Sequence, residues 1–364
     1  MRITLLGAGH IGQTIARLLA ASGDYEVCVV DRSAAALQRL APLALTTRVV
    51  DTGDGAALSA ALLGQDAVIN ALPYHLATFA ATAARDAGCH YFDLTEDVAA
   101  TREIKRLAEG AATAFMPQCG LAPGFIGIVA HHLAQGFERL VDVKMRVGAL
   151  PAFPTNALKY NLTWSVDGLI NEYVHPCEAI RDGQSIEVLP LEGLEHFSLD
   201  GTEYEAFNTS GGLGTLCETL AGRVRTLDYK SVRYPGHREL MKMLLEDLKL
   251  SQDTETLKDV LRRAIPSTMQ DVVLVFVTVS GERGGALVQE VFARKIFADR
   301  DEANPLSAIQ ITTAAGVCAA VDLFREGRLP QRGFIRQEQV ALPDFLANRF
   351  GAAYRQSRQV ESIG

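Results

Sequence analysis

The most constraining feature of this 364-residue chain is a glycine pattern near its start, Gly7-Ala8-Gly9-His10-Ile11-Gly12. It follows a short apolar run and precedes apolar residues spaced three and four apart, which is typical of a strand, a turn and a helix. Gly7 permits the tight turn, Gly9 leaves room for a pyrophosphate, and Gly12 lets the helix pack closely on the strand. The helix N-terminus then offers free N–H groups to the phosphates. The pattern predicts a dinucleotide-binding unit.

The next strand, residues 25–30, ends at Asp31, nineteen residues after Gly12. A carboxylate here accepts hydrogen bonds from the adenosine ribose and repels a 2′-phosphate, so we expect NAD in preference to NADP. Arg32 follows directly and would attract that phosphate, which keeps NADP as the alternative. Asp51, at the end of the third strand, is expected near the adenine. The predicted cofactor contacts are Gly7, Gly9, His10, Ile11, Gly12, Asp31, Arg32, Asp51, Ala71, Leu72, Pro73, Leu94 and Thr95.

Apolar runs and helical patterns continue to alternate over the first 125 residues, which predicts a Rossmann-type, doubly wound parallel sheet. The further strands are expected at 47–51, 65–71, 89–94 and 113–116, and the helices between them at 55–63, 76–87 and 98–110. Ligands of such sheets bind beyond the carboxyl ends of the strands. The groups there that transfer protons are Asp93, His75, Tyr74 and Glu96, with helix capping as the alternative role of Asp93 and a surface position as that of His75.

The middle of the chain has a different pattern. Strands are expected at 139–150, 229–234, 271–280 and 287–297, connected by hairpins more than by helices, which predicts an α+β domain with a largely antiparallel sheet. Residues 160–165 alternate as in a strand. The final helices, 308–324 and 344–354, are expected to return to the first domain. The predicted domains are therefore 1–122 with 305–364, and 123–304.

Composition excludes several classes of protein. A net charge of −8 gives no general attraction to nucleic acid or to anionic membranes, and no run reaches 18 apolar residues. The six cysteines form no CxxC pair and no zinc spacing with histidine, so no metal site is expected and the thiols are expected to be reduced. Because the chain begins with a strand rather than a signal peptide, a cytoplasmic location is expected.

Motifs along nearly the whole chain resemble the saccharopine dehydrogenase-like family. They include the glycine loop, Ala71-Leu72-Pro73-Tyr74-His75, Tyr91-Phe92-Asp93-Leu94-Thr95-Glu96, Gly120-Leu121-Ala122-Pro123-Gly124 and Phe345-Leu346-Ala347-Asn348-Arg349-Phe350-Gly351. The middle segments, residues 158–169, 171–176 and 233–237, are similar to lysine 6-dehydrogenases. One departure is Ala122, since many members have an aspartate there, and any role of that carboxylate is absent here or supplied elsewhere.

The resemblance implies that a nicotinamide cofactor oxidises an amine, with L-lysine as the expected substrate. Its ε-amine would become a semialdehyde that cyclises to 1-piperideine-6-carboxylate, with release of ammonia and NADH. The alternative within the family is reductive joining of an amine to a carbonyl, as in saccharopine reductase or carboxynorspermidine synthase. A non-catalytic nucleotide-sensing protein is a further alternative. The family also implies a homodimer, formed through the second domain.

An amino-acid substrate needs a cation for its carboxylate, and Arg233 and Lys159 are the candidates. His237 is a candidate substrate ligand, and Cys119 lies in the loop that follows the sixth strand. The predicted substrate contacts are Cys119, Leu121, Lys159, Tyr160, Asn161, Thr163, Arg233 and His237.

Overall fold

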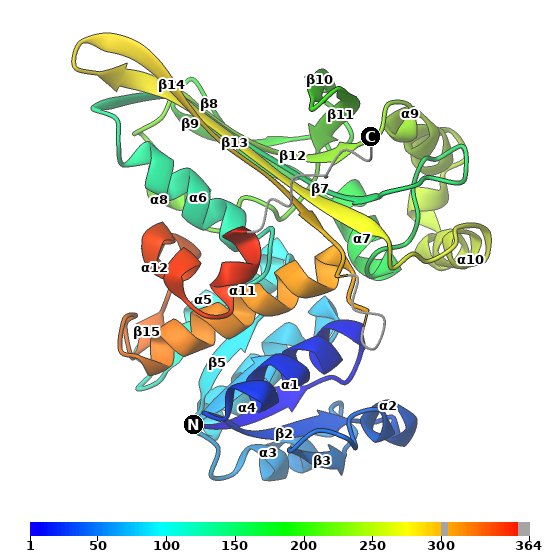
Figure 1. The fold of residues 1–364 in the computed structure, drawn as a ribbon, viewed down its shortest axis with the longest axis vertical. Helices are drawn as coiled ribbons and strands as arrows, with labels where there is room; N and C mark the ends of the chain where they lie inside the picture. Colours follow the sequence, from blue (N-terminus) through cyan, green and yellow to red (C-terminus); the bar gives the residue numbers. More distant parts are fainter. Residues whose placement is uncertain (300–304, 356–364) are drawn as a thin grey trace, which may run out of the picture. The chain divides into compact units, whose positions relative to one another are not determined.

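The computed structural model describes residues 1–299 and 305–355 (Figure 1). The chain divides into two compact units: Met1–Ile128 with Gln310–Ala353, and Val129–Ile309, which also takes Tyr354 and Arg355 of the described residues. Two of the three transitions fall inside the helices α6 (Phe125–Ala134) and α11 (Ala308–Arg325), and the third falls in the short 3-10 turn η5 (Gly351–Arg355). The predicted domains were 1–122 with 305–364, and 123–304. Residues 300–304 and 356–364 of those ranges lie outside the described residues.

The first unit is built on a seven-stranded parallel sheet, which confirms the predicted Rossmann-type architecture. Its strand order is β15-β6-β5-β4-β1-β2-β3. The strands are β1 (Arg2–Leu6), β2 (Glu26–Asp31), β3 (Thr46–Val49), β4 (Ala67–Asn70), β5 (His90–Asp93), β6 (Ala114–Met116) and β15 (Gly333–Phe334). The helices, with η marking short turns, are α1 (His10–Ser22), α2 (Ala34–Gln38), α3 (Gly55–Leu62), η1 (Tyr74–Leu76), α4 (Ala77–Asp86), α5 (Val98–Leu107), η4 (Gln337–Gln339), α12 (Leu342–Ala347) and η5 (Gly351–Arg355).

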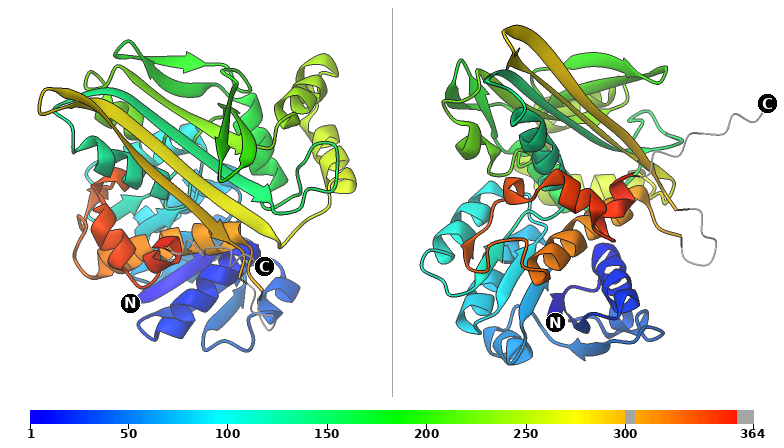
Figure 2. Two further views of the ribbon diagram at one scale, coloured as in Figure 1. Left: turned by 45° about the horizontal axis from the view of Figure 1, so that its top comes forward. Right: turned by 60° about the vertical axis from the view of Figure 1, so that its left-hand side comes forward.

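Helices cover both faces of this sheet (Figure 2). The alanine-rich α4, together with α3 and α5, packs on the face that carries Tyr91. On the opposite face Phe92 contacts Phe324 of α11, because successive strand residues point to opposite sides. By length and composition alone α11 is apolar enough to cross a membrane, but 83% of that stretch is buried inside the protein. The apolar character of α11 therefore fits a helix that is buried against one face of the parallel sheet.

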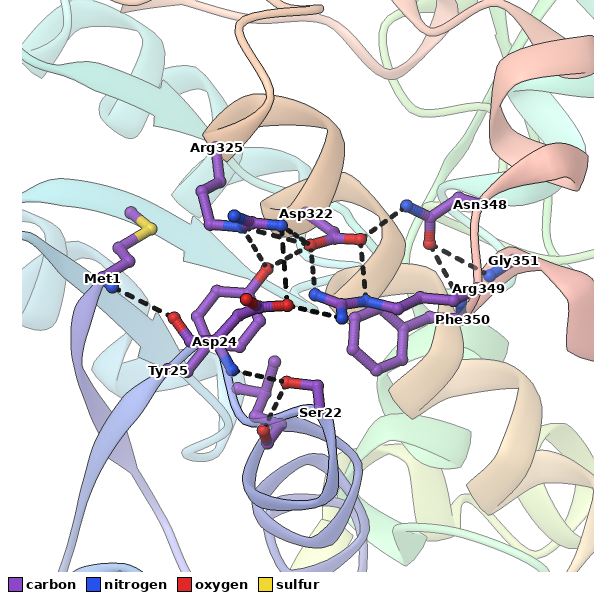
Figure 3. Close-up of polar contacts among 11 residues, drawn as sticks. Met1, Ser22, Asp24, Tyr25, Asp322, Arg325, Asn348, Arg349, Phe350 and Gly351 are labelled. Carbon is purple, nitrogen blue, oxygen red and sulfur yellow. Dashed lines mark hydrogen bonds and ion pairs between the residues drawn. The ribbon is translucent and has the colours of Figure 1, made fainter.

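The C-terminal segment is tied to the start of the first unit by one buried carboxylate (Figure 3). Asp322, on α11, accepts hydrogen bonds from the Tyr25 hydroxyl at 2.5 Å and from the Asn348 amide at 2.8 Å. It also pairs with Arg325 at 3.1 Å and Arg349 at 2.8 Å. Burial alone would raise the pKa of Asp322, but the hydrogen bonds from these partners hold it below its ordinary value. Asp322 therefore joins residues from three distant parts of the chain.

The second unit contains a mixed, mostly antiparallel sheet, as predicted. Its order is β10-β11-β12-β7-β13-β14, with the β8–β9 hairpin attached to β12, and only β12 and β7 run parallel among its described pairs. The strands are β7 (Arg139–Pro151), β8 (Cys177–Arg181), β9 (Gln184–Val188), β10 (Glu195–Leu199), β11 (Thr202–Asn208), β12 (Thr226–Arg233), β13 (Asp271–Arg283) and β14 (Ala286–Phe297). The helices are α7 (Val166–Val174), α8 (Leu216–Leu220), α9 (His237–Lys242), η2 (Met243–Asp247), η3 (Leu250–Gln252) and α10 (Thr254–Ala264).

The strand predicted at residues 160–165 is wrong. Ser165 accepts a hydrogen bond from the Gly168 N–H and caps α7, so the helix begins at Val166. Its apolar residues Val166, Leu169, Ile170 and Tyr173 follow a helical spacing and are buried. Residues 160–165 therefore form the segment that precedes helix α7. The alternation of polar and aromatic side chains in this segment does not reflect a strand.

Candidate functional sites

The glycine loop after β1 has the geometry that a pyrophosphate requires. Gly7 has a φ of 100°, and a Cβ on it would lie 2.8 Å from the Ala71 carbonyl oxygen. A Cβ on Gly12 would lie 2.0 Å from the Gly7 carbonyl oxygen, so the helix and the loop touch backbone to backbone. Gly9, in contrast, faces open space, and no side chain caps the N-terminus of α1. The residues present therefore fit a dinucleotide phosphate, held by Gly9 and the first turn of α1.

Asp31 is held at the end of β2 by backbone hydrogen bonds. One carboxylate oxygen accepts the Ala8 N–H and the other accepts the Ser33 N–H, both at 2.7 Å. These bonds fix the carboxylate beside the glycine loop, where a ribose diol is bound in this fold. Arg32 is exposed beside it. Asp51, predicted near the adenine, lies in an exposed turn, where its carboxylate accepts the Gly53 N–H at 3.0 Å.

The end of β4 carries a buried polar residue that the sequence analysis missed. The Asn70 amide oxygen accepts the Leu72 N–H at 3.1 Å and its nitrogen donates to the Tyr91 hydroxyl at 3.0 Å. Asn70 thus shapes the turn through Ala71, Leu72 and Pro73, against which Gly7 is packed. A polar side chain at the end of an apolar strand was the available signal.

Asp93, the leading candidate for proton transfer, does not reach a solvent-facing position. It is 0% exposed, and one oxygen accepts the N–H groups of Thr95 (3.0 Å) and Gln118 (2.8 Å). The other oxygen lies 2.9 Å from the Tyr91 hydroxyl. Burial raises the pKa of Asp93 to about 6. Asp93 therefore joins the end of β5 to the loop after β6, and its predicted contact with a substrate stays a prediction. The helix cap that was its alternative role belongs to Asp97, which accepts the Ala100 N–H.

The remaining proton-transfer candidates divide by exposure. His75 is exposed and Tyr74 is half-buried, and both lie in η1 directly after the β4 turn, with ring centroids 5.8 Å apart. Glu96 is half-buried next to Thr95, whose hydroxyl accepts the Asp97 N–H at 3.2 Å, and Leu94 precedes them. His75 is thus the exposed candidate, and Tyr74 and Glu96 are both half-buried.

The loop after β6 is packed into the first unit. Cys119 is buried, with its sulfur 3.1 Å from the Met116 carbonyl and 3.2 Å from the Gln337 amide nitrogen. A Cβ on Gly316 of α11 would lie 2.6 Å from the Cys119 carbonyl oxygen, so the helix also presses on this loop. Leu121 is buried as well. Cys119 and Leu121 thus pack inside the first unit, and their predicted contacts with a substrate stay predictions.

The second unit contains a buried cation without a carboxylate. Arg233, at the end of β12, is 3% exposed, and its Nε donates to the Tyr173 hydroxyl at 3.0 Å. Its Nη1 donates to the Val232 carbonyl at 2.8 Å. Among residues 1–299 and 305–355, no carboxylate lies within ion-pair distance of it, although buried charges in proteins are normally paired. The guanidinium lies over the rings of Tyr160 at 5.2 Å and Tyr173 at 5.8 Å. This arrangement leaves Nη2 for an anion.

Other predicted substrate residues have different surroundings. Lys159 is exposed and its ammonium donates to the Pro235 carbonyl at 2.9 Å, so it lies at the surface. His237 is 0% exposed, and both of its ring nitrogens have partners within the unit, so its predicted contact with a substrate stays a prediction and neither nitrogen is free for a ligand in this structure. Tyr173, which lines Arg233, was not predicted, because α7 was not recognised as a helix.

The residues next to Lys159 carry polar atoms that the described chain does not satisfy. The Tyr160 hydroxyl, the Asn161 amide oxygen and the Thr163 hydroxyl are each buried without a hydrogen-bond partner in the described residues. Such atoms are uncommon because each lost hydrogen bond to water costs about 1–3 kcal/mol. The Tyr160 ring contacts the Arg233 guanidinium directly, so one of these unsatisfied residues lies against a cation that has no ion-pair partner in the described residues.

The described part of the chain shows no cluster of side chains that could bind a metal ion. Over that part, no group of three or more histidine, cysteine, aspartate or glutamate side chains is arranged to hold an ion. The six cysteines are free and buried.

The glycine loop, the uncapped helix and Asp31 place the first unit among the dinucleotide-binding Rossmann folds. Comparison with known proteins is more specific. Residues 3–115 match the profile described as the saccharopine dehydrogenase NADP binding domain, and residues 120–350 match the saccharopine dehydrogenase C-terminal domain. The chain belongs to the saccharopine dehydrogenase family.

Individual relatives are distant. The chain is 28% identical over 270 residues to a saccharopine dehydrogenase [NADP(+), L-glutamate-forming] of Saccharomyces cerevisiae, covering 69% of this chain and 59% of that protein. It is 25% identical over 286 residues to the protein of the same name from Pyricularia oryzae, covering 72% and 60%. The chain thus spans about three fifths of the length of these relatives. The solved structure of apo saccharopine dehydrogenase (L-Glu forming) from S. cerevisiae superposes with a TM-score of 0.76 at 19% identity, covering 97% of this chain and 96% of that one, which shows a shared fold.

Proposed function

We propose that the protein is a nicotinamide-dependent oxidoreductase that oxidises the ε-amine of L-lysine, or the amine of a closely related amino acid. The observation that carries the proposal is Arg233, a buried cation without a carboxylate partner in the described chain, in a protein that also has a dinucleotide site. A bidentate guanidinium is the group that best recognises an amino-acid carboxylate. Membership of the saccharopine dehydrogenase family supports chemistry at a carbon–nitrogen bond.

The chain's own residues would bind the substrate and move a proton. When bound, the nicotinamide supplies a hydride acceptor. Hydride can leave the amine-bearing carbon only when the nitrogen is neutral, so a base must first take a proton from the ammonium. His75, Tyr74 and Glu96 are the candidates, because Asp93 has both oxygens engaged inside the protein. The resulting imine of lysine then takes up water and loses ammonia, and the semialdehyde cyclises with its own α-amine.

A second function is supported by the names of the relatives. Both fungal proteins are saccharopine dehydrogenases that form L-glutamate with NADP(+). In that reaction a secondary amine, rather than a primary one, is the group oxidised, and its reverse joins an amine to a carbonyl. Arg233 could bind a carboxylate of either substrate, so only a direct comparison of substrates distinguishes the two functions.

A panel of substrates and cofactors tests the proposal. L-lysine, saccharopine, a carboxylated polyamine and 1,5-diaminopentane would each be supplied with NAD and with NADP, and the absorbance of the reduced nicotinamide recorded. We expect a rise with lysine and ammonia release in equal amount. If saccharopine or the polyamine gave the rise and lysine gave none, the lysine proposal would fail and the second function would replace it.

We further propose NAD as the preferred cofactor, because the Asp31 carboxylate is fixed by Ala8 and Ser33 where a 2′-phosphate would approach. The family profile and the relatives carry NADP in their names, so the preference requires a direct test. Asp31→Ser removes the repulsion and leaves Arg32 in place. We expect NADP to bind roughly 10-fold more tightly to this variant and NAD more weakly, measured by titration of each cofactor. Asp51→Ser, a change in an exposed turn, is the control and should leave both affinities unaltered. Tighter NADP than NAD binding by the unaltered protein would contradict the preference.

A homodimer formed through the second unit is also proposed. The edge strand β14 exposes Leu287 (74%) and Val291 (51%), and edge strands with exposed apolar residues need a cover. Sedimentation or light scattering should give twice the 39.3 kDa chain mass. Leu287→Lys should shift that mass toward the monomer, and a monomeric unaltered protein would contradict the proposal.

A further inference from the structure

Arg233 is surrounded by aromatic side chains, two of which, Tyr173 and His237, are linked to each other by a hydrogen bond. Tyr173, Tyr160 and His237 are each at most 2% exposed, and the His237 ring stacks on Phe207 with centroids 6.3 Å apart. The centroid of the Tyr160 ring lies 5.3 Å from that of His237. A purely structural core would fill this space with apolar residues, since each buried polar group must find a partner. Here, instead, His237 and Tyr173 form a chain of hydrogen bonds that ends at the guanidinium, and the Tyr160 hydroxyl lies beside it without a partner in the described residues.

The direction of the hydrogen bonds in this chain is fixed by chemistry. The Leu158 carbonyl can only accept, so His237 Nδ1, at 2.9 Å, carries the proton and donates to it. A neutral imidazole then has a bare Nε2, which accepts the Tyr173 O–H at 3.1 Å. Burial, and then the charge of Arg233, lowers the pKa of His237 to about 3, so the ring is neutral at pH 7.

This direction determines which side of Tyr173 faces the arginine. With its single proton directed at His237, the Tyr173 oxygen presents a lone pair to Arg233 Nε, 3.0 Å away. The Val232 carbonyl holds Nη1 at 2.8 Å. Two acceptors on neighbouring nitrogens define the plane of the guanidinium and leave Nη2 and the second N–H of Nη1 for a ligand. If the guanidinium plane were rotated, these N–H groups would no longer point together at a carboxylate.

We propose that Tyr173 and His237 are positioning residues that orient the guanidinium of Arg233 for a substrate carboxylate, and that neither touches the substrate. The inference rests on the proposed function only in taking Arg233 as the carboxylate anchor. His237 acts through Tyr173, and Tyr173 acts through Arg233 Nε. The identity of His237 therefore contributes to the affinity for carboxylates, although its ring is enclosed by other side chains.

The test uses Tyr173→Phe and His237→Phe, which keep aromatic packing and remove one member of the chain each. Both should raise KM for lysine by about 10- to 100-fold while kcat changes by less than about threefold, because positioning of a remote carboxylate acts mainly on binding. His237→Gln retains a donor and an acceptor and should recover part of the loss. The double variant should be no worse than either single variant, because the two side chains act in series.

Binding of L-norleucine separates this inference from the proposed reaction. Norleucine has the lysine carboxylate without the ε-amine, so it binds the anchor and does not react. Calorimetric affinity for norleucine should fall about 10-fold or more in Tyr173→Phe, while 1-aminopentane, which lacks the carboxylate, should show no such fall. If lysine proves not to be oxidised but norleucine binding behaves in this way, the positioning role stands and the proposed reaction fails. Additive effects of the two changes, or equal effects on both ligands, would overturn the positioning role.

Discussion

The Arg233→Met variant is expected to lower kcat/KM for L-lysine by roughly a thousandfold, mostly through KM. Methionine fills much of the space of the arginine stem but leaves the substrate carboxylate to enter a buried site without a cation. The same change should have little effect on 1,5-diaminopentane, which is lysine without its carboxylate. The ratio of kcat/KM for the two amines should therefore fall from a large value to about one. Initial rates of nicotinamide reduction with each amine measure this ratio.

Two further variants control that experiment. Arg233→Lys restores a point charge without the fork and should recover only part of the loss. Lys159→Met removes an exposed cation that contacts the Pro235 carbonyl, and should change kcat/KM less than threefold. The dinucleotide affinity and the melting temperature report whether Arg233→Met is folded. Equal losses with lysine and 1,5-diaminopentane in a folded variant would show that Arg233 does not bind the carboxylate.

The Asp322→Asn variant is expected to have the largest effect on stability. The side chain of Asp322 is 2% exposed and pairs with Arg325 and Arg349, so the change leaves these two guanidinium groups with the exposed Asp24 as their only carboxylate among the described residues. Breaking a buried pair costs about 3–5 kcal/mol, and because both arginines are about one third exposed we expect about 3 kcal/mol. The melting temperature should fall by roughly 5–10 °C in a scan followed by circular dichroism.

Asp24→Asn is the matched control for this change. Asp24 pairs with the same two arginines, at 2.6 Å from Arg349 and 3.8 Å from Arg325, but its side chain is 42% exposed. An exposed pair contributes about 0–1 kcal/mol, so this variant should melt within a few degrees of the unaltered protein. Equal shifts in the two variants would show that the buried position of Asp322 is not what matters.

The pH dependence of the difference gives a second check. The folded pKa of Asp322 lies below its ordinary value, so the ionised carboxylate stabilises the fold above roughly pH 4. That contribution is lost as the pH falls from there through the lower folded pKa. The gap in melting temperature between the unaltered protein and Asp322→Asn should therefore be largest near neutral pH and should shrink in acid.

Much of the fold was predictable because its signals are local. The glycine loop needs only a strand, a turn and a helix in succession, and Gly7 and Gly12 are confined by the backbone of residues within the same unit. The alternation of strands and helices in turn predicts a parallel sheet. The helix α7 was missed because polar and aromatic residues before Ser165 were interpreted as a strand pattern. The short β15 strand was missed because its pairing with β6 involves residues more than two hundred positions away.

The candidate site residues were less predictable. Asp93, Cys119 and His237 have side chains suited to catalysis and lie at the ends of predicted elements, yet the structure encloses each of them among internal partners. Asn70 and Tyr173 were not among the predicted site residues, yet Asn70 accepts a hydrogen bond from the Leu72 N–H in the turn after β4 and Tyr173 accepts one from Arg233. The residue type shows which hydrogen bonds or protons a side chain can exchange. Its partners in the folded protein decide whether those atoms are still available to a ligand.

By itself the sequence determined the Rossmann-type sheet, the dinucleotide loop and Asp31 at the second strand end, since these depend on backbone freedom and spacing within about thirty residues. Only the tertiary structure decided which polar groups are satisfied internally. Asp322 is enclosed by Tyr25, Arg325, Asn348 and Arg349, whereas Arg233 has no carboxylate of the described residues at ion-pair distance, and Glu172 acts on it only from farther away. A buried charge must be neutralised by something close in space, and closeness between residues hundreds of positions apart is set by folding rather than by local pattern.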